Sequence, residues 1–179
     1  MKITIVNSER EFDVAAAWKI IGQLLAKPDS VIGLSTGRTT KNMHEIVSDI
    51  YRQYPFDASK VTFFGVDELT NLPRSYAGCC WTMIEAQLTG PLGIPEDRFL
   101  MPPTISEDHE GDCRRFQQAL EDRGGIDLQI LGLGQTVTLA STSRVLPLGA
   151  RHGFLPWMLS SRRGSARRPA SRRTMSWAA

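Results

Sequence analysis

The stretch VIGLSTGRTT, residues 31–40, decides how this chain folds. Its first four residues are a short apolar run that predicts a buried strand, and the Ser-Thr-Gly that follows predicts a turn. Beyond the turn, Met43, Ile46, Val47 and Ile50 recur at i, i+3, i+4 and i+7, the spacing of one face of a helix. The stretch is therefore a strand whose end opens through a small-residue turn into a helix N-terminus.

Strands and helices alternate on both sides of this stretch. We expect further strands at residues 2–6, 61–66, 98–101 and 126–131. Further helices are expected over 8–26, with a capping box at its start, over 76–88, and from Ser106 to the Gly124-Gly125 pair. Such alternation predicts one α/β domain with an open, mostly parallel, Rossmann-like sheet and helices on both faces. Ligands of such sheets bind beyond the carboxyl ends of the strands.

The turn after the quoted strand has the residues of an anion site. A helix N-terminus presents unpaired N–H groups and the positive end of the helix dipole, and both favour an anion. Hydroxyl groups flank Gly37, which lets the backbone approach a ligand, and Arg38 can add bidentate charge. A sugar phosphate fits this turn, although the spacing is not that of a P-loop. The alternative is an ordinary helix cap from Thr39 or Thr40 with a solvated Arg38.

Two carboxylates, Asp67 and Glu68, directly follow the strand expected at 61–66. One of them can act as a general base while the other supports a neighbour or the loop, and a solvated turn is the alternative. A third strand end, at residues 132–135, has the sequence Gly-Leu-Gly-Gln. Residues capable of chemistry are thus concentrated at three expected strand ends.

The charge distribution changes abruptly after Gln135. Residues 1–135 carry all 19 acidic side chains and 13 of the 21 basic ones, a net charge of −6. Residues 136–179 carry eight arginines and no Asp, Glu or Lys, a net charge of +8. A genuine basic arm could neutralise nucleic-acid phosphates. Trp157 and Trp177 form no stacking pattern, however, and no nucleic-acid fold precedes them, so we expect no nucleic-acid partner.

The cysteines and the apolar runs exclude other classes. Cys79, Cys80 and Cys113 lack the spacing of a disulfide framework or a zinc site, so we expect buried free thiols and no metal. The N-terminus lacks the charged-then-apolar pattern of a signal region, and no stretch reaches the roughly 20 apolar residues of a spanning helix. We therefore expect a soluble, cytoplasmic protein without a membrane partner.

Five motifs within residues 1–135 resemble, in order, the glucosamine-6-phosphate deaminase family and its galactosamine-6-phosphate isomerase-like branch. They are GLSTGRTT (33–40), VTFFGVDELTNLP (61–73), SYAGCCWTMIEAQL (75–88), LGIPEDRFLMPP (92–103) and DLQILGLGQ (127–135). The resemblance implies isomerisation and deamination of a hexosamine 6-phosphate to a ketohexose 6-phosphate and ammonia, without cofactor or metal. It also implies a homo-oligomer for an intact family member. The choice between glucosamine and galactosamine substrates stays open.

The resemblance also assigns roles to individual residues. The substrate phosphate would bind at Ser35, Thr36, Gly37, Arg38 and Thr39. Arg38 stands where the family more commonly has glycine. Asp67 would move a proton between C2 and C1 of the open-chain sugar, with Glu68 beside it. Gly132 and Gly134 would form a loop of the substrate site.

The family continues after its last matched strand as x-N-G-H-I-G-F-N-E-P-G, whereas this chain continues as TVTLASTSRV, residues 136–145. Written as ACG GTC ACA TTG GCT TCA ACG AGC CGG GTN, these codons read one base earlier as GGT CAC ATT GGC TTC AAC GAG CCG GGT, which encodes GHIGFNEPG. One restored A before the first codon returns the asparagine. We interpret residues 136–179 as an out-of-frame, disordered tail on a truncated domain, residues 1–135. The family's ring-opening histidine is then replaced by Thr138, so we expect the chain as written to be inactive.

Two other functions stay open. The first is 6-phosphogluconolactonase, a related hydrolase with similar strand ends, although that family usually places Arg after Asp-Glu, where this chain has Leu69. The second is a non-catalytic fragment. Ammonia release, measured against lactone hydrolysis, distinguishes the two enzymes.

Overall fold

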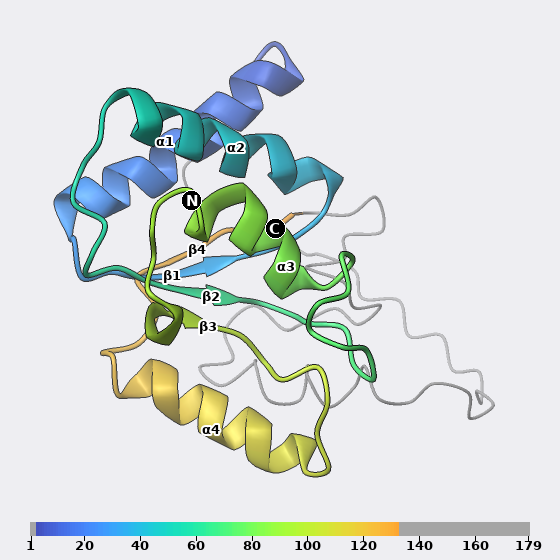
Figure 1. Cartoon of the computed structure of the whole chain (residues 1–179). Helices are drawn as coiled ribbons and strands as arrows, with labels where there is room; N and C mark the ends of the chain where they lie inside the picture. Colours follow the sequence, from blue (N-terminus) through green and yellow to red (C-terminus); the bar gives the residue numbers. More distant parts are fainter. Residues whose placement is uncertain (1–2, 133–179) are drawn as a thin grey trace, which may run out of the picture.

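The strand β1 (Val31–Leu34) lies inside a four-stranded sheet in the computed structural model of the protein, which describes residues 3–132. The strand order is β3-β2-β1-β4, and each of these pairings is parallel. The other strands are β2 (Thr62–Gly65), β3 (Phe99–Leu100) and β4 (Leu128–Gln129). The expected open parallel sheet is confirmed, and helices cover both of its faces (Figure 1).

The two central strands are buried because helices cover both faces of these short apolar runs. All four residues of β1 and all four of β2 are buried, and the strands pair in register from Val31 opposite Thr62 to Leu34 opposite Gly65. β3 pairs with β2, and β4 with β1, over only two residues each. The strands predicted at 98–101 and 126–131 are therefore present but shorter than expected.

Three helical segments cover one face of the sheet and one helix covers the other (Figure 1). The first face carries α1 (Glu9–Ala26), α2 (Arg38–Gln53) and α3 (Cys80–Ile84), which continues as the π-helix η1 (Glu85–Thr89). The opposite face carries α4 (His109–Glu121), and the 3-10 helix η2 (Glu96–Arg98) precedes β3. The chain moves outward from β1 through β2 to β3 and then returns to the other side of β1 as β4. Because parallel crossovers are right-handed, this reversal places α4 on the opposite face.

Each face of the sheet has its own apolar cluster. The larger cluster joins the sheet to α1, α2 and the α3–η1 segment, whereas the smaller cluster lies under α4. The smaller one consists of Val31, Phe64, Val66, Phe116 and Leu120. A Cβ atom at Gly33 would lie 2.4 Å from the tip of the Phe64 ring, so only glycine leaves room for that ring across β1.

The helix ends follow the local sequence with small differences. Ser8 Oγ accepts the N–H of Glu11 at 3.2 Å, as the capping box predicts, but the Glu11 carboxylate accepts the N–H of Asn7 rather than that of Ser8. α4 is capped by Asp108 and not by Ser106, since the Asp108 carboxylate accepts the N–H of Gly111 at 2.9 Å. The predicted stop at Gly124-Gly125 is confirmed, because both glycines have positive φ, 91° and 84°.

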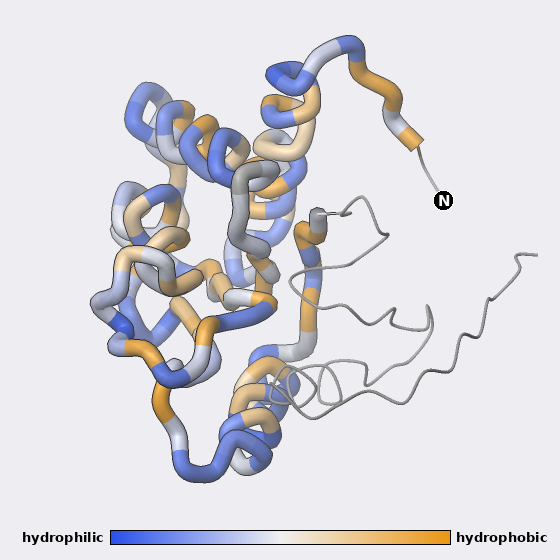
Figure 2. The backbone as a smooth tube through the Cα atoms, turned by 90° about the vertical axis from the view of Figure 1, so that its right-hand side faces the viewer, coloured by the Kyte–Doolittle hydropathy of each residue, from blue (hydrophilic) through white to orange (hydrophobic). Residues whose placement is uncertain are grey.

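Two predictions differ from the structure: the strand at residues 2–6 is absent from the described residues 3–6, and the helix at 76–88 starts later than expected. Residues 3–6 form no strand, and Ile5 is 90% exposed. Figure 2 shows this segment leading away from the four described strands, so it pairs with none of them. The helix expected over 76–88 begins only at Cys80, and Tyr76 lies half-exposed in the preceding loop.

Pro91 explains how α2 and η1 are joined. In a regular helix the carbonyl of Gln87 would accept an N–H from residue 91, but proline has none. The hydroxyl of Ser48, on α2, donates to that carbonyl at 2.6 Å instead. The helix widens here, and the N–H of Gly90 donates to Glu85 O at 2.9 Å across five residues.

His44 is the buried titratable group of this same contact. Its ring is fully buried, and Nδ1 lies 3.1 Å from Gln87 Oε1. Nε2 has no hydrogen-bond partner within the described residues. Burial lowers the pKa of His44 from its ordinary value of 6.5, because a charged ring would be desolvated there.

We expect the stability of the chain to depend on pH through His44. The unfolded ring takes up a proton near pH 6.5, whereas the folded ring does so only at lower pH. Below about pH 6.5 the unfolded state therefore binds more protons than the folded state. The free energy of unfolding is highest above that pH and decreases below it by up to about 1.4 kcal/mol per pH unit. Urea unfolding at about pH 8 and about pH 5.5 measures this. His44→Gln, which keeps a polar partner for Gln87 but does not titrate, should flatten the dependence; an unchanged slope would contradict the assignment.

Candidate functional site

The strand order reverses between β1 and β4, because β2 and β3 are added on one side of β1 and β4 on the other. The site lies at the carboxyl ends of the strands around this point. In open α/β sheets such a reversal leaves a crevice beyond the strand ends. The segments that follow β1, β2 and β4 are residues 35–37, Asp67-Glu68 and Gly132. Because the strands are parallel, all three segments emerge at this one edge. The segments after β1 and β2 therefore lie together as predicted, and Gly132 is the described part of the third segment.

The turn after β1 is built as a strand-to-helix junction. Gly37 is the N-cap of α2 with φ 140° and ψ 179°, and it supplies no side-chain cap. The hydroxyl of Thr40 donates back to Ser35 O at 3.0 Å, so it does not cap the helix. The Ser35 hydroxyl is buried and has no hydrogen-bond partner within the described residues. The helix N-terminus and this hydroxyl are the unpaired polar groups of the turn.

The remaining predicted residues of the turn and of the β4 end are placed as follows. Arg38 begins α2, and its side chain lies outside the described part of the structure. Thr39 is exposed on the first turn of α2. Gly132, which is partly exposed, follows β4, and Gly134 lies outside the described residues.

Glu68 anchors the start of α3. Its carboxylate accepts the N–H groups of Cys80 and Trp81, each at 2.8 Å, and also its neighbour's N–H at 2.8 Å. The first N–H groups of a helix lack partners within the helix, and a carboxylate there is favoured by the helix dipole. Glu68 thus fastens the end of β2 to the N-terminus of α3.

Cys80 connects the β1 turn to the end of β2. Its Sγ lies 3.0 Å from Thr36 Oγ1 on one side and 3.9 Å from Asp67 Oδ1 on the other. The contact at 3.9 Å is the weaker of the two. The predicted phosphate turn and the predicted base are therefore in contact through one side chain.

The thiols of the described residues are buried and free, as expected. Burial raises the pKa of Cys80 to about 12 and, to a smaller extent, the pKa of Cys79 and Cys113. These thiols stay protonated near neutral pH, so they are hydrogen-bond donors rather than nucleophiles. Within residues 3–132, no three His, Cys, Asp or Glu side chains are grouped to hold a metal ion. Nor is any helix in this range long and apolar enough to span a membrane.

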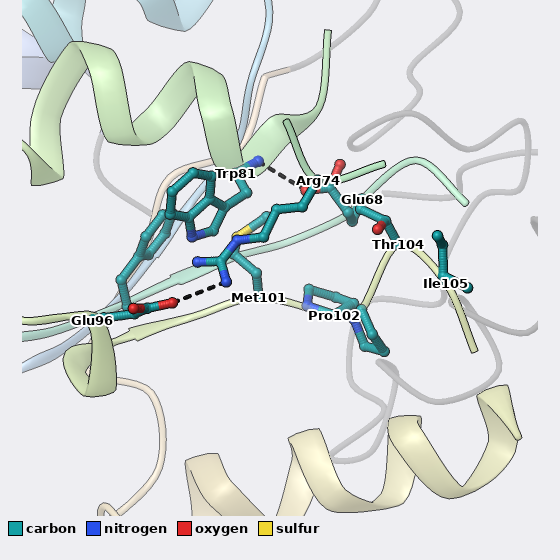
Figure 3. Close-up of a pocket in the computed structure, with 10 residues that line it drawn as sticks. Glu68, Arg74, Trp81, Glu96, Met101, Pro102, Thr104 and Ile105 are labelled. Atoms are coloured by element: carbon teal, nitrogen blue, oxygen red, sulfur yellow. Dashed lines mark hydrogen bonds and ion pairs between the residues drawn. The ribbon is translucent and has the colours of Figure 1, made fainter. Parts of the chain in front are cut away.

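A cavity of about 350 Å³ lies at the β3 edge of the sheet, beside the site rather than within it. The Trp81 ring forms one wall, with the Arg74 guanidinium 3.7 Å from its centre and Phe99 stacked on it at 6.2 Å. Arg74 also pairs with Glu96 at 2.9 Å, and the segment that carries Thr104 lies opposite (Figure 3). Glu68 borders this cavity and so links it to the strand ends.

Sequence reasoning did not place Cys80 in the site. Both adjacent cysteines are buried, and Cys79 precedes α3 whereas Cys80 begins it. Cys79 Sγ contacts Pro73 O at 3.5 Å, whereas Cys80 Sγ contacts the two strand-end segments. No local pattern distinguishes the two cysteines, because the contacts of Cys80 are with residues 13 and 44 positions away.

The fold and the site define an α/β protein with an open helix N-terminus and a carboxylate at the strand ends. Residues 14–142 match the family of glucosamine-6-phosphate isomerases/6-phosphogluconolactonase, and the chain belongs to this family.

Curated relatives are about one third identical to this chain over the matched region. Glucosamine-6-phosphate deaminase of Clostridium botulinum (strain Loch Maree / Type A3) is 34% identical over 134 residues, which are 75% of this chain and 55% of the relative. That of Halothermothrix orenii is also 34% identical over 134 residues, 75% of this chain and 56% of the relative. The chain thus spans just over half the length of these curated relatives.

Solved structures share the fold. A monomeric glucosamine-6-phosphate deaminase is similar with a TM-score of 0.74 and 23% identity, over 78% of this chain and 58% of that chain. A 6-phosphogluconolactonase from Plasmodium vivax is similar with a TM-score of 0.63 and 24% identity, over 76% and 49%.

We expect Glu68→Ala to lower the free energy of unfolding by about 2–3 kcal/mol, because it removes a charged cap from α3 and leaves its N–H groups unpaired. Glu96→Ala is the matched control, since its exposed pair with Arg74 should contribute less than about 1 kcal/mol. Urea denaturation of both variants measures the difference. Equal losses would contradict the anchoring role of Glu68.

Proposed function

We propose that the intact protein isomerises and deaminates a hexosamine 6-phosphate, either glucosamine 6-phosphate or galactosamine 6-phosphate. The products are a ketohexose 6-phosphate and ammonia. The protein would thus be an enzyme of amino-sugar phosphate metabolism, working without a metal or an organic cofactor. Two curated relatives that are 34% identical to this chain over 134 residues carry the name glucosamine-6-phosphate deaminase, which supports this choice.

The observation that carries the proposal is the turn between β1 and α2. An uncapped helix N-terminus and the unpartnered Ser35 hydroxyl lie at the edge where ligands of such sheets bind. A phosphate group would accept hydrogen bonds from the N–H groups of residues 37–39 and from the hydroxyls of Ser35 and Thr36. Arg38, at the first position of α2, would add positive charge.

Asp67 would then act on the carbon end of the same sugar. The proton on C2 of the open-chain aldose is weakly acidic because it is next to the C1 carbonyl. The Asp67 carboxylate would take this proton from C2 and return it to C1. The C1 carbonyl oxygen would gain a proton and the amino nitrogen would lose one, so that C1 becomes a hydroxymethyl group and C2 an imine. Water would hydrolyse the imine to the ketose and release ammonia. A positioned carboxylate suffices as the base for this step.

The rival activity is lactone hydrolysis, because solved 6-phosphogluconolactonases share the fold. Leu69 after Asp67-Glu68 favours the deaminase, since lactonases usually have arginine at that position. On a chain with its downstream half in frame, release of ammonia from a hexosamine 6-phosphate supports the proposal. Hydrolysis of a 6-phosphogluconolactone without ammonia release would overturn it.

We propose further that residues 136–179 are read out of frame, on a domain that begins with residues 1–135. The match to the family extends to residue 142, just past the change in charge at Gln135. An independent read of the gene across codons 134–138 tests this, with one base missing relative to close relatives as the expected result. An unambiguous read without a missing base would contradict it. The chain as written is then expected to release no ammonia. The protein encoded by a gene with one adenine inserted before the codon of Thr136 is expected to release it.

Asp67→Asn in the frame-restored enzyme should lower turnover by about 10²–10⁴-fold with little change in substrate binding, because it keeps the size of the side chain but removes the base. The control is Asp57→Asn. In the wild-type chain the Asp57 carboxylate accepts hydrogen bonds from Ser59 in the loop before β2, at the opposite edge of the sheet. Steady-state assays of ammonia release give both constants. Near-normal turnover would move the role of base away from Asp67.

A further inference from the structure

Cys80 is held at the meeting point of the β1 turn, the end of β2 and α3. Its backbone N–H donates to Glu68 Oε1 at 2.8 Å, and this hydrogen bond fixes the position of the Cys80 backbone. Its Sγ then lies between Thr36 Oγ1, at 3.0 Å, and Asp67 Oδ1, at 3.9 Å. The residue is almost completely buried, with 5% of its surface exposed. Among the described residues, this one side chain therefore contacts both halves of the proposed site.

The chemistry of these contacts is asymmetric. Burial raises the pKa of Cys80 to about 12, so near neutral pH it carries one S–H proton. Thr36 can either donate to sulfur or accept from it, whereas an ionised Asp67 can only accept. With the Thr36 hydroxyl donating to sulfur, the S–H proton is directed to Asp67. When the Thr36 hydroxyl donates elsewhere, its oxygen is free to accept the S–H proton instead.

We propose that Cys80 is a positioning residue that couples the Thr36 hydroxyl to the Asp67 carboxylate. The use of this coupling in catalysis rests on the proposed function. A phosphate at the β1 turn would draw the Thr36 hydroxyl proton to itself, and the Cys80 S–H would turn from Asp67 to Thr36. Occupation of the phosphate turn would thereby release a hydrogen bond from the carboxylate that acts as base. The base becomes more available when the substrate is in place.

The test is a double-mutant cycle on the 179-residue chain, read at the side-chain carboxyl carbon of Asp67 by ¹³C NMR near neutral pH without ligand. Thr36→Val removes the hydroxyl and keeps the shape of the side chain. It should displace the Asp67 signal in the wild-type background. In the Cys80→Ala background the displacement should shrink to that seen at the remote carboxyl of Asp57. Cys80→Val, which keeps volume without a donor, replaces Cys80→Ala if that variant does not fold.

Two control backgrounds separate coupling from packing. Cys79→Ala alters the neighbouring buried thiol, which contacts Pro73 O, and should leave the displacement at its wild-type size. Cys80→Ser retains a donor at the same place and should retain most of the displacement. A displacement that is equal with and without Cys80, or that is absent in the wild-type background, overturns the proposal.

Ammonia release tests the proposed function separately from the coupling. If the cycle shows coupling but the frame-restored enzyme releases no ammonia, the contact through Cys80 stands and the deaminase proposal fails. If ammonia is released but the Asp67 signal does not respond through Cys80, the coupling fails and the deaminase proposal stands.

Discussion

The parallel pairing of β1 with a strand on each side is the constraint on which the rest of the structure depends. Because β1 and β2 pair in register to Leu34 and Gly65, their carboxyl ends lie side by side. A side chain that enters from α3 can then contact the segments after both strands. On the other side of β1, the Asp127 carboxylate accepts the N–H of Val31 at 2.9 Å and pairs with Lys27 at 2.8 Å. This interaction holds the start of β4 against the start of β1, at the edge of the sheet opposite the site.

Much of the fold could be predicted from the sequence because apolar runs and helical spacings are local signals. β1, β2, α1 and α2 lie close to their predicted ranges, and the alternation of strands and helices indicated helices on both faces of the sheet. The ends of β3 and β4 were not predictable, since a strand extends only as far as a neighbour pairs with it. Residues 3–6 have strand-forming side chains but pair with none of the strands in residues 3–132. The start of α3 depends on Glu68, twelve residues earlier in the chain than Cys80.

The proposed site divides in the same way. Ser35, Thr36 and Asp67 follow apolar runs directly, and their position in the sequence was enough to mark them. The anchoring role of Glu68 and the contacts of Cys80 join residues that are 12 to 44 positions apart, and no local pattern carries that information. The two adjacent carboxylates are distinguished by these long-range contacts. Glu68 is occupied by backbone N–H groups, whereas Asp67 faces the thiol.

The π-helix η1 keeps a row of buried side chains on one face of the α3–η1 segment. The buried residues Cys80, Ile84, Leu88 and Leu92 are spaced by four. On a helix of 3.6 residues per turn, a strict spacing of four drifts by about 40° per step, so such residues would wind away from a flat neighbour. The wider turn at Glu85–Thr89 takes up the excess and reverses the drift. Cys80 can therefore face the strand ends while Leu88 stays in the core, and the wider turn keeps both side chains on the same side of the segment.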